Sequence, residues 1–269
     1  MLAIKNNLMA ANAARHLGNS YDALAQSVER LSSGLRINSA KDDAAGLAVR
    51  ELMRADIAVL QQGARNAQDG ISMLQTMEGA MQTINEALVR MKQLAEQAST
   101  ESYSDTQLEI MDNEFQEMAN EIERIATSTK FNSIGMLDNS ATKTIHFGGT
   151  DDYIEVTGTN MTKSGLGINS VAISSRDSAV AALGTLDSAI STKDTARAAF
   201  GYKMNRLEST VSVLSVQAEN LIASESRISD VDVATEVALM TRNQVLAQAG
   251  TAMLAQANTI PQMALTLLR

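Results

Sequence analysis

Apolar residues near the start of the chain recur at alternating spacings of four and three. They are Leu17, Tyr21, Leu24, Val28 and Leu31. This spacing is one seam of a heptad pattern and predicts an amphipathic helix. Gly34 interrupts the pattern, and the polar segment 36–43 predicts an irregular link. Ser39 followed by Asp42 resembles a capping box, so we expect a new helix to begin there.

The same spacing continues through a much longer second segment, from residue 43 to residue 98. Its apolar positions are Met53, Ile57, Leu60, Ala64, Ala67, Ile71 and Leu74, followed after a slip near Met77 by Met81, Ile84, Leu88, Met91 and Leu94. The predicted helix would be roughly 80 Å long. Gly63, Gly70 and Gly79 lie inside it, and each costs up to about 1 kcal/mol. Such a helix therefore needs lateral packing along its length.

A third predicted helix follows, and after it comes a segment without helical periodicity. Ser104 and Gln107 form a second capping box. It precedes the apolar stripe Leu108, Met111, Phe115, Met118, Ile122 and Ile125. The short polar turn before this helix predicts that it packs antiparallel to the second one. Residues 129–176 lose the helical period, and 143–147 and 153–157 read as short strands joined by a hairpin loop at 148–152.

Helix returns in the last third of the chain. Residues 177–225 carry the stripe Phe200, Met204, Leu207, Val211, Leu214, Ala218 and Leu221. Ser229 and Asp230 are expected to cap a last helix, which has a heptad repeat of Leu239, Leu246, Met253 and Ile260. The single proline of the chain, Pro261, is expected to kink or end that helix.

These elements predict a mainly α fold: a long antiparallel helical bundle or coiled coil with a small β-hairpin insert. We expect a discontinuous terminal coiled-coil domain from 1–40 and 229–269, and a helical rod domain from 41–228 with the hairpin near 140–175. The terminal segments are amphipathic but narrow, so they should order only against partners. The pattern leaves open whether that partner is the other terminus, another subunit or a membrane.

The composition and charge of the chain exclude several classes of function. The 269 residues are 45% hydrophobic but only 3% aromatic, which suits narrow helix seams. A net charge of -9 disfavours nucleic-acid binding. No apolar run reaches about 18 residues, so we expect no membrane insertion. The first seven residues lack a signal-peptide layout, and an exported protein of this kind would use a route without a cleaved signal. The absence of cysteine excludes disulfides and thiolate metal sites.

Candidate chemistry is sparse. His16 and His146 are the only histidines, and no H-E-x-x-H, P-loop or nucleophile motif occurs. The pair Gly148 and Gly149 indicates a turn rather than a phosphate-binding loop. The carboxylates lie opposite the apolar stripes and indicate solvated helix faces, while the Met-rich stripe of the second helix indicates core filling rather than a binding groove. We therefore expect no enzyme activity and no catalytic, cofactor-binding or metal-binding residues.

Several runs of residues resemble bacterial flagellin, the subunit of the flagellar filament. They are Arg30-Leu-Ser-Ser-Gly-Leu-Arg-Ile-Asn-Ser-Ala-Lys-Asp-Asp-Ala-Ala-Gly-Leu47, Asn66-Ala-Gln-Asp-Gly-Ile71, Lys130-Phe-Asn132, Ala249-Gly-Thr-Ala-Met-Leu-Ala-Gln-Ala-Asn258 and Leu265-Thr-Leu-Leu-Arg269. The resemblance covers about 1–135 and 175–269. It implies an inner coiled-coil domain made by the terminal helices, with the long helices and hairpin forming the next domain outward. Residues 140–175 leave no room for the variable outer domains of long flagellins.

The resemblance implies a structural subunit that polymerises into the filament for motility. A hook–filament junction protein of the same family is the alternative. Two other hypotheses have less support. A flagellin that carries a zinc protease would need the H-E-x-x-H motif, which this sequence lacks, and the acidic net charge opposes a membrane-active protein. The implied partners are further copies of the chain, an export chaperone bound by residues 230–269, and the hook-associated and cap proteins. The implied location is the extracellular flagellum, reached by export through the flagellum's own channel.

Particular residues acquire expected roles from this resemblance. The seams of polymerisation would be Leu17, Leu24, Val28, Leu31, Leu239, Leu246 and Met253. Host innate immune receptors are further implied partners: Arg90, Leu94 and Glu114 match the residues that contact Toll-like receptor 5. The alternative is that Leu94 is a seam residue and that Arg90 is a solvated charge. Residues 36–47 match the segment recognised by plants, with Arg36, Asp42, Asp43 and Gly46 as its epitope. In the intact chain the same segment would connect two helices, and its acids would favour a helix N-terminus.

Overall fold

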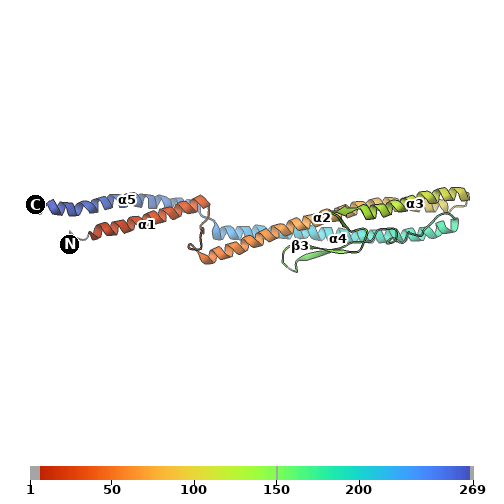
Figure 1. Ribbon diagram of the computed structural model, residues 1–269, viewed down its shortest axis with the longest axis horizontal. Helices are drawn as coiled ribbons and strands as arrows, with labels where there is room; N and C mark the ends of the chain where they lie inside the picture. Colours follow the sequence, from red (N-terminus) through yellow and green to blue (C-terminus); the bar gives the residue numbers. More distant parts are fainter. Residues whose placement is uncertain (1–6, 150, 267–269) are drawn as a thin grey trace. The chain divides into compact units, whose positions relative to one another are not determined.

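A computed structural model describes residues 7–149 and 151–266, with side chains as far as residue 260. The described elements are α1 (Leu8–Ser33), α2 (Ala44–Ala98), α3 (Asp105–Ser128), β1 (Lys130–Phe131), β2 (Ile134–Gly135), β3 (Thr142–His146), β4 (Tyr153–Thr157), α4 (Arg176–Ser229) and α5 (Val233–Thr266) (Figure 1). The predicted mainly α fold with a small hairpin is confirmed. Two compact units form, a terminal unit of Met1–Ile57 with Glu219–Arg269 and a central unit of Ala58–Ala218. The boundaries predicted at 40 and 229 both fall inside the terminal unit.

The central unit has a thin core of Met, Leu and Ile between its helices. Its most deeply buried large side chains are Leu74, Met77, Met81, Ile84, Leu88, Met91, Leu94, Phe115, Ile122, Met136, Leu137 and Phe200. They come from α2, α3, α4 and the segment after β2. The methionine stripe of α2 therefore fills the core as predicted, because flexible thioether chains adapt to the gaps between straight helices.

The hairpin lies against α2. Strand β3 pairs antiparallel with β4 in a register that places Ile145 opposite Ile154. Both residues are buried, and so is Val156, which gives the alternation expected of a sheet with one covered face. The predicted first strand was one residue too late. The short pair β1–β2 was not predicted, because two-residue strands give no period; its turn holds Asn132 and Ser133 at φ 47° and 65°.

One glycine of α2 is explained by this contact. A Cβ on Gly63 would lie 1.8 Å from the carbonyl oxygen of Phe147, at the end of the hairpin. Nearby, the Asn66 side chain donates from Nδ2 to the His146 carbonyl at 3.0 Å. The glycine therefore lets the hairpin backbone approach the helix closely, whereas Gly79 has open space around the same position.

Two helix starts differ from the prediction. The Asp43 side chain, rather than Ser39, accepts the backbone N–H of Gly46 at 2.9 Å and caps α2. Asp232, rather than Ser229 or Asp230, accepts the N–H of Ala234 at 3.0 Å and caps α5. In each case the nearer acidic side chain has the spacing needed to reach a free N–H of the first turn.

Of the two outcomes predicted for Pro261, an end of the helix is wrong, because α5 continues to Thr266. A proline inside a helix leaves the carbonyl four residues earlier without its partner. Here that carbonyl belongs to Ala257, and it accepts a hydrogen bond from the Asn7 side chain at 2.8 Å. The vacant acceptor is thus satisfied by the residue that precedes α1.

Gly63→Ala should detach the hairpin from α2, since the new methyl group would occupy the space of the Phe147 carbonyl. We expect the free energy of unfolding of the central unit to fall by about 1–3 kcal/mol, the usual cost of overpacking. The matched control is Gly79→Ala, which should raise it by roughly 0.5–1 kcal/mol through helix propensity. Chemical denaturation followed by circular dichroism measures both, and equal effects of the two substitutions would contradict the close approach.

Candidate functional site: the terminal helix pair

Helices α1 and α5 pack along one another in the terminal unit and run antiparallel (Figure 1). Their contact is made by small side chains. Its buried residues are Ser27, Ala247 and Ala257, together with Glu236, which faces Arg30. A Cβ on Gly250 would lie 3.1 Å from Cδ1 of Leu17, which shows how closely the helices approach. The intramolecular interface therefore buries little apolar area for its length.

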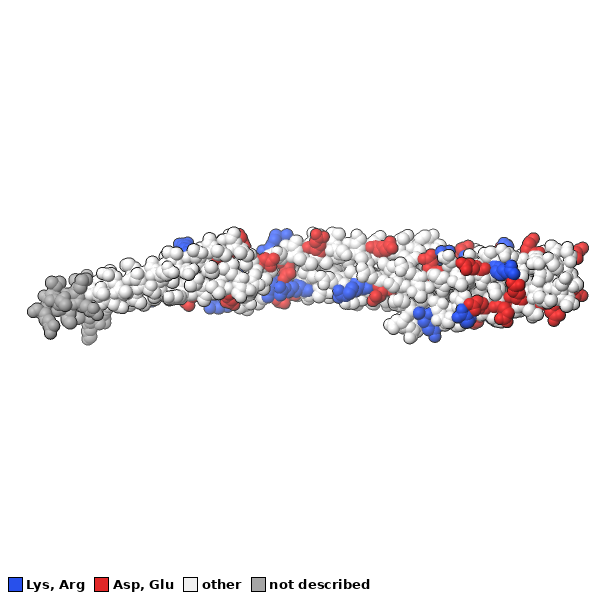
Figure 2. All heavy atoms as spheres, turned by 90° about the horizontal axis from the view of Figure 1, so that it is seen from above, with Lys and Arg blue, Asp and Glu red and all other residues white. Residues whose placement is uncertain are grey.

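Large apolar side chains of the same two helices point outward. They are Leu8, Met9, Tyr21 and Val28 on α1, and Val233, Val237, Leu239, Val245, Leu246 and Met253 on α5. Leu246 is 46% exposed and Met253 is 64% exposed, and clustered exposed apolar residues mark an interaction surface. Glu236 and Arg242 are the only charged residues in the sequence of α5. Figure 2 shows few charged side chains over this part of the molecule. Such a face is typical of a helix that a partner covers.

The seven predicted seam residues divide between two faces. Leu17, Leu24 and Leu31 are half-buried, and Leu17 lies against Gly250 of α5. The others, Val28, Leu239, Leu246 and Met253, lie on the outward faces. The single heptad pattern in the sequence thus contains two groups of residues, one that is half-buried within the subunit and one that is exposed.

An open groove of about 520 Å³ runs between the two helices. Leu17, Leu246 and Met253 supply its large apolar side chains, with Ala13 and Gly250 between them. The described residues that line it include His16 but neither a carboxylate nor a Lys or Arg. The groove therefore suits an apolar helix face better than a charged ligand.

Backbone contacts hold the link between α1 and α2 against the turn between α4 and α5. Gly34 ends α1 in the left-handed region, at φ 74°. The N–H of Arg36 donates to the Ser229 carbonyl at 2.6 Å, and the N–H of Val231 donates to the Gly34 carbonyl at 3.1 Å. These paired bonds join the two segments at the place where α1 ends and α5 begins.

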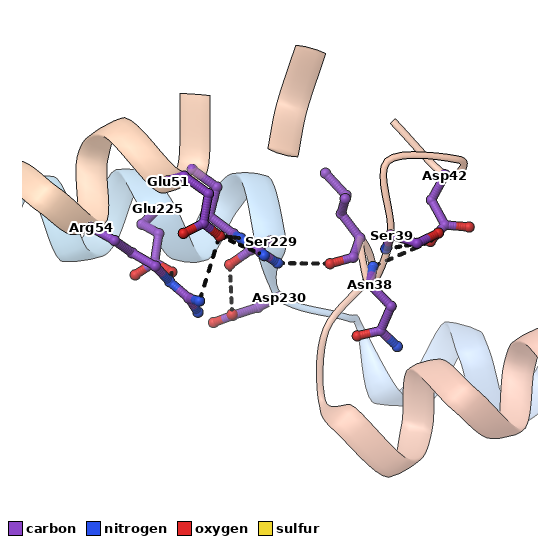
Figure 3. A network of polar contacts seen from close by, with 10 residues as sticks. Asn38, Ser39, Asp42, Glu51, Arg54, Glu225, Ser229 and Asp230 are labelled. Carbon is purple, nitrogen blue, oxygen red and sulfur yellow. Dashed lines mark hydrogen bonds and ion pairs between the residues drawn. The ribbon is translucent and has the colours of Figure 1, made fainter. Parts of the chain in front are cut away.

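Two arginines of α2 support this junction (Figure 3). Arg50 is 7% exposed and donates from Nη1 to the Ile37 carbonyl at 2.8 Å. Arg54 donates from Nε to Glu225 of α4 at 2.7 Å, and this hydrogen bond raises the pKa of Arg54. The sequence patterns did not reveal either residue, because a charged side chain at a helical spacing reads as a solvated one.

The four predicted epitope residues are all engaged within the protein. Asp42 accepts hydrogen bonds from the backbone N–H groups of Ser39 and Asn38, at 3.0 and 3.2 Å (Figure 3). Arg36 donates to the Ile228 carbonyl at 2.6 Å. Asp43 caps α2 through the N–H of Gly46, where a Cβ would lie 2.5 Å from the Asp43 carboxylate. The segment 36–47 therefore has the connecting role in the intact chain.

The predicted receptor residues of the central unit are only partly accessible. Arg90 donates from Nε and Nη2 to one carboxylate oxygen of Glu114, at 2.8 and 2.6 Å, and both side chains are about half exposed. Leu94 is 2% exposed and packs in the core. The structure thus gives Leu94 the alternative role of a seam residue, because its four-three spacing places it on the inner stripe of α2.

The described residues offer little for catalysis. Among them, no group of three or more His, Cys, Asp or Glu side chains is placed to hold a metal ion. His146 contacts Tyr153 across the hairpin, with ring centroids 5.4 Å apart. None of the helices in the described ranges is long and apolar enough to cross a membrane.

Comparisons with known proteins assign the family. The sequence model of the bacterial flagellin N-terminal helical region matches residues 4–142, and that of the bacterial flagellin C-terminal helical region matches residues 183–268. The chain belongs to the bacterial flagellin family. It is 42% identical to a flagellin of Halalkalibacterium halodurans and 40% identical to the flagellar filament 31.3 kDa core protein of Treponema maltophilum, in each case over the full length of both chains. A flagellin of Bacillus subtilis is 36% identical over the same span.

Solved structures agree with this assignment. The crystal structure of Bacillus cereus flagellin aligns with a TM-score of 0.51 and 29% identity, covering 60% of this flagellin and 94% of that chain. A putative flagellar hook-associated protein from Vibrio parahaemolyticus aligns with a TM-score of 0.59 over 70% of this chain, but at 14% identity it shows a shared fold alone.

Acid should loosen the link around Asp42 and the start of α5 around Asp232. Hydrogen bonds from Ser39 lower the pKa of Asp42, and those from Thr235 lower the pKa of Asp232. Their stabilising contribution is therefore complete above the unfolded pKa of about 3.9 and is lost as pH falls through the lower folded pKa. In an NMR titration the Ser39 and Thr235 amides should shift with midpoints below about 3.9. Asp42→Asn should abolish the Ser39 response, and a midpoint above that value would contradict the assigned contacts.

Proposed function

We propose that this flagellin is a structural subunit of the bacterial flagellar filament and that it polymerises through the outward faces of α1 and α5. The observation that carries the proposal is the exposed apolar stripe of α5, represented by Leu246 and Met253. Full-length relatives named as flagellin and flagellar filament core protein support the filament role. Flagellins are structural proteins, and we assign no catalytic activity to this one.

The energetics favour self-association. Burying one Leu side chain stabilises by about 1.5–3 kcal/mol. A helical polymer can bury each outward side chain against a neighbouring copy, and the repeated contact adds along the filament. The small residues of the α1–α5 contact leave these larger side chains free for that purpose. A hook–filament junction role is the second candidate, but its support here is a shared fold, whereas the full-length relatives are filament proteins.

Leu246→Asp should block assembly while leaving the folded monomer intact, because Leu246 is 46% exposed on the open side of the groove between α1 and α5. In the filament the substitution would lose apolar burial and desolvate a charge, which together cost several kcal/mol. The critical concentration for seeded polymerisation should therefore rise more than about a hundredfold. Sedimentation of filaments measures it, and circular dichroism checks that the monomer keeps its helix content.

The matched control is Ala255→Asp, which adds the same charge to α5 at an exposed position whose neighbours on the helix face, Thr251 and Thr259, are polar. It should polymerise far better than Leu246→Asp. Normal filament yield from Leu246→Asp, or equal losses from both substitutions, would refute the proposed face. Leu24→Asp is less suitable, because Leu24 also contributes to the intramolecular contact.

Other partners follow from the same proposal. We propose that residues 230–269 bind an export chaperone before assembly, since α5 exposes apolar side chains in the isolated subunit. The cap and hook-associated proteins would meet the same terminal unit at the filament ends. Export would proceed without a cleaved signal peptide to an extracellular flagellum. Isothermal titration calorimetry with the full chain and with a chain lacking 230–269 tests the chaperone site, and unchanged affinity would exclude it.

Arg90 and Glu114 are proposed as a contact for Toll-like receptor 5, on the strength of the matching sequence and their exposure on adjacent helices. Arg90→Ala should weaken receptor signalling by the monomer. Leu94→Ala should act differently, lowering stability by about 2–5 kcal/mol as a core truncation. The control is Arg124→Ala, which removes another exposed ion pair, with Glu121. A cell reporter assay measures signalling, and identical responses to Arg90→Ala and Arg124→Ala would argue against the contact.

Residues 36–47 are proposed as a plant-recognised epitope that acts as a fragment. Asp42 and Asp43 are occupied by hydrogen bonds in the folded chain and become free in an excised peptide. A synthetic 30–50 peptide should trigger an oxidative burst in leaf tissue, and Asp43→Ala should reduce it sharply. A scrambled peptide is the control. A silent wild-type peptide beside an active standard would rule out this epitope.

A further inference from the structure

Asn7 stands immediately before α1 and bonds in two directions. Its Oδ1 accepts the backbone N–H of Ala10 at 3.1 Å, which caps α1. Its Nδ2 donates to the carbonyl of Ala257 on α5 at 2.8 Å. A side-chain amide can do both at once because it carries an acceptor oxygen and a donor nitrogen on one rigid group.

The Ala257 carbonyl is free to accept this hydrogen bond because of the residue four positions later in the chain. In an uninterrupted helix this carbonyl would accept the N–H of residue 261. Residue 261 is proline, which has no N–H, yet α5 continues to Thr266. An unpaired carbonyl inside a helix contact costs free energy. The Asn7 amide therefore supplies the hydrogen bond that Pro261 removes.

The α1–α5 contact has particular need of such a bond. Apart from Glu236 its buried side chains are small, and smooth surfaces of this kind specify helix register poorly. A single polar contact is a known means of fixing register in a helix pair. Near the opposite end of α1, Arg30 lies 3.6 Å from the nearly buried Glu236 of α5, so each end of the contact has one polar pairing.

We propose that Asn7 and Pro261 form a matched pair that sets the register of α1 on α5 and so aligns the outward faces of both helices for assembly. The inference rests on the proposed polymerisation through these faces. Asn7 acts as a positioning residue, and Pro261 acts by leaving the Ala257 carbonyl without an intrahelical partner. The pair predicts that each residue matters only while the other is present.

Asn7→Asp isolates the bond to α5. An aspartate keeps the acceptor that caps α1 but cannot donate to the Ala257 carbonyl. We expect the critical concentration for polymerisation of the full chain to rise on the order of tenfold. Asn12→Asp adds the same charge to α1 farther from this bond and should have a much smaller effect.

Pro261→Ala provides the decisive test, because it restores an N–H for the Ala257 carbonyl. In that background Asn7→Asp should lose most of its effect, so that the double substitution polymerises much better than Asn7→Asp alone. Simple gain of helix propensity at 261 would make the two effects additive, and additivity would overturn the pairing. The proposed function fails separately, if the unmodified chain forms no filaments or if Leu246→Asp polymerises normally.

Discussion

A long amphipathic helix in water is stable only where something covers its apolar stripe, and this requirement governs both units of the flagellin. The central unit meets it internally. Met77, Met81 and Met91 of α2 pack among residues of α3 and α4, and the hairpin packs against α2 near Gly63. The terminal unit meets it only in part, because the α1–α5 contact covers a strip of small residues and leaves larger ones exposed.

That difference separates folding from assembly. Side chains that complete the central core cannot also serve a neighbouring subunit, so the core depends little on the presence of other copies. In the terminal unit the inner strip sets how α1 and α5 lie together, while the outer strip stays available. The junction between 34–43 and the α4–α5 turn uses backbone bonds and the buried Arg50, which do not consume apolar surface. Apolar area is thereby reserved for contacts between molecules.

The helices, the hairpin and the family were predictable from the sequence because each depends on local periodicity or on long residue runs. Capping was less predictable: Asp43 and Asp232 lie within a few residues of the predicted caps, and only the backbone geometry decides which side chain reaches a free N–H. Burial along α1 was also less predictable: Val28 and Leu31 fit one heptad pattern, yet Val28 is exposed and Leu31 is half-buried, because α5 covers only part of that apolar stripe. Contacts between distant segments, such as Arg54 with Glu225 or Asn7 with Ala257, leave no periodic signal.

Tyr21 on the outer face of α1 has a further consequence. The chain has no tryptophan, and its other aromatic residues all belong to the central unit or to segments within it. Tyr21 is consequently the sole near-ultraviolet chromophore of the terminal unit, and the residue is 51% exposed to solvent. The molecule thus carries its own optical label at the surface proposed for polymerisation, so that changes in the environment of that surface can be followed without attaching a dye.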